Sequence, residues 1–315
     1  MSEVRRAPRY TGVRTFAGLP HAPLALEGQS AAESSPRAAV VGVPFDTATS
    51  WRPGARFGPE AIRSASALLR PWHPGHGLEV FGSLGALDAG DVAITPGNAE
   101  RSAAQIAAAL GPLCAGGTIP VVLGGDHSIL LGELRAHAAA RGPLALVVLD
   151  AHADTWEDYY GERLFHGTVL RRAAEEGLLD PGSSLIAGLR GPLYEPADLE
   201  DARDLGFELV TIEELRGGGP AAFAARTRER VAGAPALLSF DIDVVDPSAA
   251  PGTGTPEIGG LLGAETLALL RSLAGVSFTG FDVVEVSPPY DSRGQITALL
   301  AANIAYEMLA LAALT

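Results

Sequence analysis

The sequence Pro143-Leu-Ala-Leu-Val-Val-Leu149 runs directly into Asp150-Ala-His152-Ala-Asp154. The first seven residues form an apolar run of the kind that makes a buried parallel strand. Asp150, His152 and Asp154 alternate with alanine, so an extended chain points all three side chains to one side. Two carboxylates and an imidazole in one space repel one another or collect protons unless a cation is present. We interpret the segment as half of a metal site; the alternative is an ordinary polar loop after a strand.

Two further apolar runs end in the same way. Pro120-Val-Val-Leu123 is followed by Gly124-Gly-Asp-His-Ser128, and Pro235-Ala-Leu-Leu-Ser-Phe240 is followed by Asp241-Ile-Asp243. In an open α/β sheet, ligands bind outside the carboxyl ends of the strands. Three strands that each end in Asp or His therefore predict one shared site, whereas surface polarity explains only a single such ending well.

The three segments resemble the signatures of a known family. Gly-Gly-Asp-His-Ser (124–128), Asp-Ala-His-Ala-Asp (150–154) and Ser-Phe-Asp-Ile-Asp-Val-Val-Asp-Pro (239–247) are similar to the three motifs of the ureohydrolases. That family includes arginase, agmatinase, guanidinobutyrase and proclavaminate amidinohydrolase. The similarity runs from about residue 38 to the end of the chain. It implies an α/β fold of the three-layer α/β/α arginase-like type, with a mostly parallel central sheet.

The resemblance implies a binuclear metal centre. Its ligands would be His127, Asp150, His152, Asp154, Asp241 and Asp243, with Asp150 and Asp241 bridging the two ions. Oxygen-rich ligands with some imidazole and no thiolate suit manganese better than a structural zinc. We therefore expect two Mn²⁺ per subunit, although ligand type alone leaves Ni²⁺ and Co²⁺ open. Without metal, two carboxylates about 4 Å apart repel by roughly 4 kcal/mol at an effective dielectric of about 20.

The resemblance also implies the catalytic residues. Glu285 lies in a segment similar to the family element whose glutamate holds the guanidinium, and His166-Gly-Thr168 matches the element that carries the acid/base histidine. Asp154 would help to move the proton of the attacking hydroxide, and His166 would serve proton transfer at the amine. Taken alone, His166 would more readily be a capping histidine.

Residues 155–166 are predicted to form a lid over the site, because the segment is aromatic and acidic and follows the metal motif directly. The Gly- and Pro-rich loop 44–59 is expected to be pocket wall and subunit contact rather than chemistry. We expect Asp126 to support a metal ligand, Asp246 to occupy a turn, and His137 to be a surface or packing histidine. The predicted lid residues are Trp156, Asp158, Tyr160 and Arg163.

The identity of the substrate depends on which side chains would bind the end opposite its guanidinium. The segments 252–256 and 285–291 are more similar to the agmatinase branch than to arginase, which implies hydrolysis of agmatine to putrescine, a step of polyamine metabolism. Acidic lid residues (Glu157, Asp158 and Glu162) would attract the ammonium of agmatine. Arg163 would instead attract a carboxylate, and the N-terminal pattern resembles guanidinobutyrase and proclavaminate amidinohydrolase. Guanidinobutyrase, guanidinopropionase and proclavaminate amidinohydrolase activities are therefore the alternatives.

Other classes of protein fit the sequence less well. A metal-dependent amide deacetylase of related fold normally uses one zinc and fewer carboxylates, whereas formiminoglutamate hydrolysis stays open within the superfamily. A non-catalytic relative would be expected to have lost a ligand first, and none is missing from the motifs.

Composition bears on partners and location. The formal net charge of −14 disfavours nucleic acid and is compatible with a cationic substrate, although acidic surfaces often serve only solubility. The single cysteine, Cys114, excludes an internal disulfide, fits a reducing cytoplasm and is treated as a packing residue. The N-terminus lacks the apolar segment of a signal peptide, and we expect no apolar run long enough to cross a bilayer. A cytoplasmic enzyme without a membrane partner is expected.

We divide the chain into an N-terminal arm, residues 1–36, and a single catalytic domain, residues 37–315. Aromatic residues such as Tyr10 and Phe16 predict that the arm packs on the body or on a neighbouring subunit, and a disordered terminus is the alternative. The family forms trimers and hexamers, which implies a homo-oligomer. Further strands are predicted at 38–43, 84–92, 184–188, 207–210 and 276–286, and helices at 59–69, 98–113, 130–140, 220–232, 261–273 and 295–314.

Overall fold

The computed structural model of the protein describes residues 8–9, 11–24 and 36–315. Its central element is an eight-stranded sheet in the order β4-β1-β5-β10-β9-β6-β7-β8. Every neighbouring pair in this sheet is parallel. The strands are β1 (Ala38–Gly42), β4 (Leu87–Asp91), β5 (Ile119–Leu123), β6 (Ala145–Leu149), β7 (Leu185–Leu189), β8 (Glu208–Thr211), β9 (Ala236–Asp241) and β10 (Phe278–Val284).

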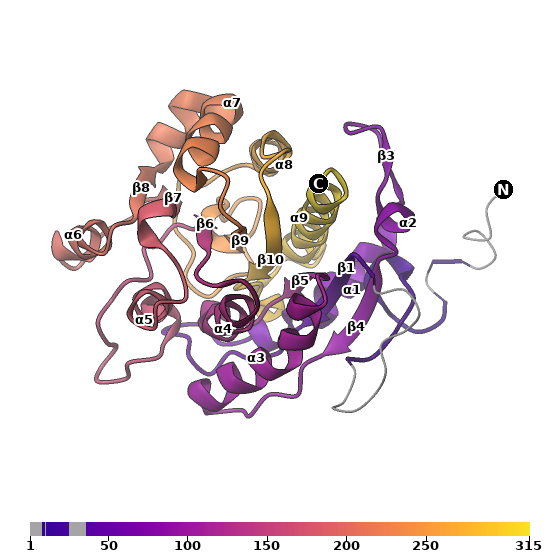
Figure 1. Ribbon diagram of the computed structural model, residues 1–315, viewed down its shortest axis with the longest axis horizontal. Helices are drawn as coiled ribbons and strands as arrows, with labels where there is room; N and C mark the ends of the chain where they lie inside the picture. Colours follow the sequence, from indigo (N-terminus) through magenta and orange to yellow (C-terminus); the bar gives the residue numbers. More distant parts are fainter. Residues whose placement is uncertain (1–7, 10, 25–35) are drawn as a thin grey trace.

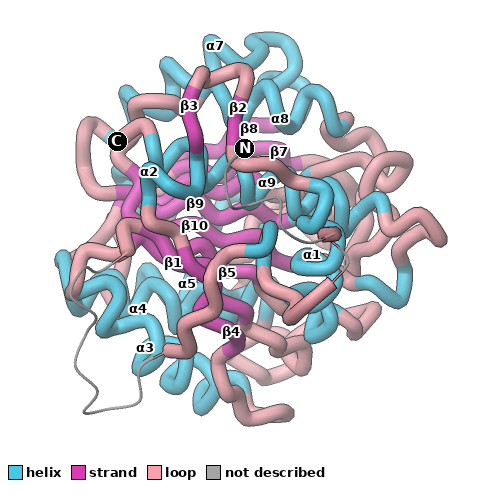
Figure 2. Tube along the Cα trace, turned by 90° about the vertical axis from the view of Figure 1, so that its right-hand side faces the viewer, coloured by secondary structure: helices cyan, strands magenta, loops and turns pink. Residues whose placement is uncertain are grey.

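Helices cover both faces of the sheet, so the predicted three-layer α/β/α architecture is confirmed (Figure 1). One layer holds α1 (Gly58–Ala65), α7 (Ile212–Val231), α8 (Gly263–Ser272) and α9 (Ile296–Ala313). The other holds α3 (Ala99–Ala115), α4 (Leu130–Arg141) and α5 (Val169–Glu175). Seen from the side, the strands of the central sheet lie between helices (Figure 2). This arrangement explains why β6 and β9 consist of wholly buried residues rather than alternating ones.

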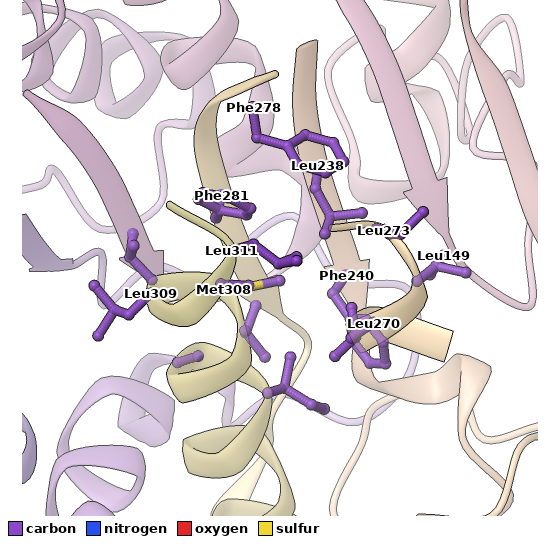
Figure 3. Packing of buried hydrophobic residues seen from close by; sticks show 14 of the residues in the cluster. Leu149, Leu238, Phe240, Leu270, Leu273, Phe278, Phe281, Met308, Leu309 and Leu311 are labelled. Carbon is purple, nitrogen blue, oxygen red and sulfur yellow. The ribbon is translucent and has the colours of Figure 1, made fainter. Parts of the chain in front are cut away.

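The largest part of the core lies between α9 and the centre of the sheet. Phe240 of β9 and Phe281 of β10 are fully buried there, and Met308, Leu309 and Leu311 of α9 pack in the same cluster (Figure 3). Because α9 lies between the sheet, α1 and α8, it is apolar on most of its circumference.

The expectation that no apolar segment could cross a bilayer needs a correction. The helix Ile296–Ala313 is long and apolar enough to do so by length and composition. However, 72% of that segment is buried inside the protein. Its apolar character is therefore that of a core helix, which length and composition alone do not distinguish from a membrane span.

The strand register brings the predicted motifs together. Strands β5, β10, β9 and β6 are neighbours, and their carboxyl ends stop at the same edge of the sheet. Each of the three predicted motifs begins at one of these ends, so the sheet places them side by side. The paired residues at this edge are Leu123 with Val283, Asp241 with Val284, and Leu149 with Phe240.

Several elements differ from those predicted. The helix expected over 220–232 begins at Ile212, because Thr211 and Glu214 form a capping box; Gly219, with φ 70°, then interrupts it before Pro220. The Gly-Gly-Gly-Pro run hid this first part of α7 from the helical pattern. Further short elements not predicted are β2 (Trp72–His73), β3 (Leu78–Glu79), α2 (Val80–Leu84) and α6 (Ala197–Asp204).

The described part of the N-terminal arm lies on the body. Phe16 is fully buried, and its backbone N–H donates to the Asp88 carboxylate at 2.7 Å. Asp88 also pairs with Arg63 of α1 at 2.8 Å. Tyr10, the other aromatic residue named for this arm, lies outside the described residues. The division into arm and domain stays a prediction.

His137 is a packing histidine in α4. Its side chain is fully buried, and neither ring nitrogen has a hydrogen-bond partner in the described part of the chain. The ring lies against Gly280 of β10. Burial, assisted by the nearby Arg141, lowers the pKa of His137 from 6.5 to about 4.

We predict that His137 makes the protein less stable in mild acid. Below pH 6.5 the unfolded chain binds a proton that the folded protein does not bind until about pH 4, so stability falls over this window. The loss at pH 5 is about 2 kcal/mol from this group. Urea unfolding at pH 7.5 and pH 5 should show that His137→Met loses less stability than the wild type over the interval; an equal loss in both would contradict the assignment.

Candidate metal centre

The three strand ends bring all six predicted metal ligands into one cluster. His127 opens a short 3-10 turn after β5, and Asp241 is the last residue of β9. Asp154 has a positive φ of 50°, which turns its side chain back towards the other ligands' strand ends. The remaining ligands, Asp150, His152 and Asp243, stand immediately after β6 and β9.

The ligand atoms form two adjacent groups. In the first, His127 Nδ1 lies 3.1 Å from Asp150 Oδ2, 2.9 Å from Asp154 Oδ2 and 3.7 Å from Asp241 Oδ2. In the second, His152 Nδ1 lies 3.0 Å from Asp243 Oδ2 and 3.6 Å from Asp150 Oδ1. Asp150 belongs to both groups, as a carboxylate bridging two ions would. Asp241, the other predicted bridge, lies with His127 in the first group.

The orientation of His127 fits a cation better than it fits any protein partner. Its Nε2 lies 2.9 Å from the Ser239 hydroxyl, which itself donates to Asp282 at 2.8 Å. In neutral His127, Nε2 then carries the proton and Nδ1 presents a lone pair to the carboxylates. Among the described residues, buried His127 Nδ1 and Asp150 Oδ2 have no hydrogen-bond partner. Two acceptors this close are stable only with a cation or a proton between them.

The electrostatics of the cluster support the same conclusion. Burial, and then the charges of Asp243 and Asp150, raise the pKa of Asp241 well above its usual range. Burial also raises the pKa values of Asp154 and Asp243. In contrast, His127 and His152 lower the pKa of Asp150 although burial opposes this. Divalent cations would replace the protons that these carboxylates otherwise hold, so the donor set fits two such ions.

Glu285 joins the metal centre to the predicted acid/base histidine. Its Oε1 accepts from the backbone N–H of His127 and lies 2.9 Å from His166 Nδ1. Glu285 has a positive φ of 60°, and its own N–H donates to Gly125 at 2.8 Å. A non-glycine residue held in this region of the backbone is a feature that clusters at functional sites.

The tautomer of His166 follows from its neighbours. Nε2 accepts from the Ser50 backbone N–H at 3.0 Å and lies 2.8 Å from the Ser50 hydroxyl, so in neutral His166 it is Nδ1 that donates to Glu285. Burial disfavours the charged ring, but Glu285 outweighs it and raises the pKa of His166 to about 9. The sequence predicted that the loop 44–59 forms a pocket wall, but it did not predict the hydrogen bond between Ser50 and His166.

Asp126 and Asp246 accept hydrogen bonds from backbone N–H groups near the site. Asp126 accepts from the backbone N–H groups of Ala48 and Ser128, and the carbonyl of Ala48 accepts from His166 N–H. We had expected Asp126 to support the ligand His127. It instead supports the loop that holds His166. Burial, followed by the charge of Glu285, raises its pKa to about 7. Asp246 accepts from two backbone N–H groups in its loop, which is the turn role expected of it.

A cavity of about 920 Å³ opens above the metal centre. Its floor includes Asp154, Asp241, Asp243, His152 and His166. The walls come from the loops after β1, β6, β7 and β9 and from the first residues of α6 and α7. The carboxyl ends of the strands thus carry both the predicted ligands and the cavity, as expected for an open α/β sheet.

Only one of the four predicted lid residues lines this cavity. Trp156 forms part of its wall, with its ring against Gly167. Asp158 accepts from Gly161 N–H and closes an outward turn, in which Tyr160 is 93% exposed. Arg163 is exposed and pairs with Glu175 at 2.8 Å. The lid was predicted from the aromatic and acidic residues of this segment, but residue types alone do not show that the turn points away from the site.

Arg190 lies in the cavity wall, but its charge is directed into the protein. Its guanidinium donates to the carbonyl oxygens of Gly188, Asp243 and Glu257. Arg190 therefore fixes the loops around the metal centre and offers little to a substrate.

Comparison with known proteins agrees with the site. The model of the arginase family matches residues 36–310. The chain belongs to the arginase family. It is 45% identical to guanidinobutyrase of Pseudomonas aeruginosa over 303 residues, which are 96% of this chain and 93% of that protein. It is 43% identical to mitochondrial agmatinase of Gallus gallus over 286 residues, 91% of this chain and 84% of that one.

A solved structure shows the same architecture. Proclavaminate amidinohydrolase from Streptomyces clavuligerus superposes with a TM-score of 0.90 at 43% identity, covering 98% of this chain and 99% of that chain. The ureohydrolase resemblance is therefore confirmed, and the protein is a hydrolase that acts on the C–N bonds of linear guanidino compounds. Members of this family depend on a binuclear metal centre, and the two ligand groups sharing Asp150 correspond to one.

We predict that Asp150→Asn disrupts both metal positions, whereas His152→Ala disrupts one. After dialysis against Mn²⁺, elemental analysis should find about two ions per wild-type chain, fewer than one in Asp150→Asn and about one in His152→Ala. Saturating Mn²⁺ at 100 times its Kd should stabilise the wild type by about 2.7 kcal/mol per site and the Asp150 variant much less.

Asp158→Asn is the matched control, because Asp158 is an exposed acid of the same loop region that does not face the cluster. It should bind Mn²⁺ like the wild type. Two tightly bound ions in Asp150→Asn would contradict the role of Asp150 as the shared ligand.

Proposed function

We propose that this ureohydrolase hydrolyses agmatine to putrescine and urea, with two Mn²⁺ held by the six ligands of the centre. The observation that carries the choice of agmatine is a carboxylate on the inner cavity wall. Glu257 lies with Oε1 3.9 Å from His152 Nε2, and this histidine, although burial opposes it, lowers the pKa of Glu257. An ionised carboxylate beside the reaction site can hold the ammonium of agmatine. The neighbouring Arg190 does not compete, since backbone carbonyls surround its charge.

The side chains around the metal cluster have different roles in the reaction. When bound, the metal pair lowers the pKa of water and so supplies hydroxide near neutral pH. Glu285 orients the guanidinium of the substrate. Its Oε1 is hydrogen-bonded to His127 and His166, whereas its Oε2 has no hydrogen-bond partner among the described residues. Asp154, on the cavity floor, accepts the proton of the nucleophile. His166, fixed between Glu285 and Ser50, delivers a proton to the departing amine.

A guanidino acid is the second candidate substrate. Arg52 lies at the cavity mouth, 5.2 Å from the centre of the Tyr290 ring, and none of the described residues hydrogen-bonds or ion-pairs with its guanidinium. A guanidinium that stacks on Tyr290 and has no carboxylate partner among the described residues suits the carboxylate of 4-guanidinobutyrate or a similar compound. The relatives named guanidinobutyrase and proclavaminate amidinohydrolase point in the same direction. The acids of the lid turn, on which agmatine was first expected, lie outside the cavity and do not bear on the choice.

We predict urea release from agmatine by the Mn²⁺-loaded protein, and a lower kcat/KM for 4-guanidinobutyrate, 3-guanidinopropionate and arginine. A colorimetric urea assay across this panel provides the measurement, with Asp150→Asn as the inactive control. A higher kcat/KM for an acid-tailed compound would select the second candidate. Release of no urea from any of these compounds, with Mn²⁺, Ni²⁺ or Co²⁺, would refute hydrolysis of this class of substrate.

We predict that Glu257→Gln raises KM for agmatine about tenfold, which corresponds to about 1.4 kcal/mol of lost binding, while KM for 4-guanidinobutyrate stays the same or falls. The amide removes the charge and keeps the shape, so the effect reports the ion pair with the ammonium. Glu162→Gln, in the exposed lid turn, serves as the matched control and should leave both KM values unchanged. Equal changes for the two substrates would show that Glu257 acts on the metal centre instead.

A further inference from the structure

The cavity is larger than agmatine requires. Agmatine has about nine non-hydrogen atoms, whereas the cavity measures about 920 Å³, near the upper end of the roughly 300–1,000 Å³ of pockets that bury drug-sized ligands. Four of the six metal ligands (His152, Asp154, Asp241 and Asp243) line the inner end together with His166 and Glu257. A small substrate held there leaves the rest of the cavity to water.

We call the remaining part of the cavity the outer chamber. It is lined by Trp156, Leu193, Tyr194, Asp198, Leu199 and Glu213. These residues come from the loop after β6, the loop after β7 and the starts of α6 and α7. Of these residues, only Trp156 was predicted from the sequence to lie near the site.

Asp198 fixes the Trp156 side chain and the backbone of Tyr194 in the outer chamber. Its Oδ1 accepts from the Trp156 indole at 3.2 Å, and its Oδ2 accepts from the Tyr194 backbone N–H at 2.9 Å. The Trp156 and Tyr194 rings lie with centroids 5.9 Å apart. One carboxylate thus links the wall above the metal centre to the outer rim.

The rim of the outer chamber exposes apolar surface and one unpaired charge. Tyr194 is 86% exposed and Leu193 is 47% exposed, so two adjacent apolar side chains lie open beside the cavity. The Glu213 carboxylate makes no hydrogen bond or ion pair within the described part of the chain. An acid in the first turn of a helix is common, because the helix dipole favours it. The helix dipole does not explain why Glu213 lies on the cavity wall beside exposed aromatic surface.

We propose that the outer chamber is a second substrate subsite, which binds a guanidinoalkyl amine whose chain is longer than the four carbons of agmatine. The proposal rests on the proposed function, because it places the guanidinium of the longer compound at the same metal centre. Methylene groups of the tail pack on Trp156, Leu193 and Tyr194, and the terminal ammonium meets Glu213 and the aromatic faces. A carboxylate at the end of the tail would instead meet Asp198 and Glu213 and be repelled.

The test compares compounds that share the guanidinium and differ only in the tail. Urea release is measured for agmatine, 8-guanidinooctan-1-amine, octylguanidine and 8-guanidinooctanoate with Mn²⁺-loaded wild-type protein. We expect kcat/KM for the long amine to equal or exceed that for agmatine, and to exceed that for the long acid by about tenfold. Tyr194→Ala and Glu213→Gln should each lower the ratio of kcat/KM for the long amine to that for agmatine by about five- to tenfold, through KM.

Two control variants match these changes outside the cavity. Tyr160→Ala removes another exposed tyrosine, and Glu200→Gln removes another exposed acid, and neither residue lines the cavity. Both should keep the wild-type ratio. Octylguanidine separates the contribution of the apolar wall from that of Glu213, because it has the chain without the charge. Thermal unfolding of each variant checks that the fold is retained.

The outcomes distinguish this proposal from the proposed function. Rapid hydrolysis of agmatine together with kcat/KM at least tenfold lower for the long amine overturns the outer subsite alone. Hydrolysis of the long amine without hydrolysis of agmatine supports the subsite and overturns agmatine as the substrate. Equal kcat/KM for the long acid and the long amine overturns the cationic tail, and absence of urea from all four compounds overturns both proposals.

Discussion

The mutual repulsion of acceptor atoms around the His127 ring is the constraint on which the site depends. His127 Nδ1 points a lone pair at buried carboxylates, and Ser239 holds the ring in that orientation from the far side. No rearrangement inside the sheet relieves this arrangement, because the ligands stand at the ends of strands whose register the core fixes. The parallel sheet thus supplies the rigidity, and a bound cation supplies the missing attraction. Folding and metal binding are in this sense coupled through a few atoms.

Sequence alone predicted the parts of this structure that follow from strong local patterns. Apolar runs located the central strands, and their polar ends indicated one shared site because parallel strands finish at one edge. Likeness to a family then supplied the catalytic roles of Glu285 and His166. The start of α7 was missed, since three consecutive glycines interrupt its periodicity. The roles of Ser50 and Ser239 depend on partners more than a hundred residues away, so no local pattern could reveal them.

The direction of loops was the other property that composition did not determine. Asp158, Tyr160 and Arg163 have the chemistry of a lid, but a tight turn closed by Asp158 points them outward. Conversely, Tyr194 and Glu213 belong to no motif, yet the loop after β7 and the first turn of α7 place them on the cavity wall. Arg190 illustrates the same point for charge, because its location in the cavity suggests a role that its carbonyl partners preclude. Geometry decides which of several suitable side chains faces the substrate.

The separation between strand ends and loops has a consequence for how such a protein changes over evolutionary time. The groups that break the bond stand at or beyond the carboxyl ends of in-register strands, where a shift of a strand would be felt throughout the core. The groups that meet the rest of the substrate come from the loops after β7 and β9 and from the first turns of α6 and α7, and several of them, such as Tyr194 and Glu213, are exposed. Mutations there can alter substrate preference while leaving the chemistry intact. A lineage built on this scaffold can therefore diversify its substrates by small steps without passing through an inactive ancestor.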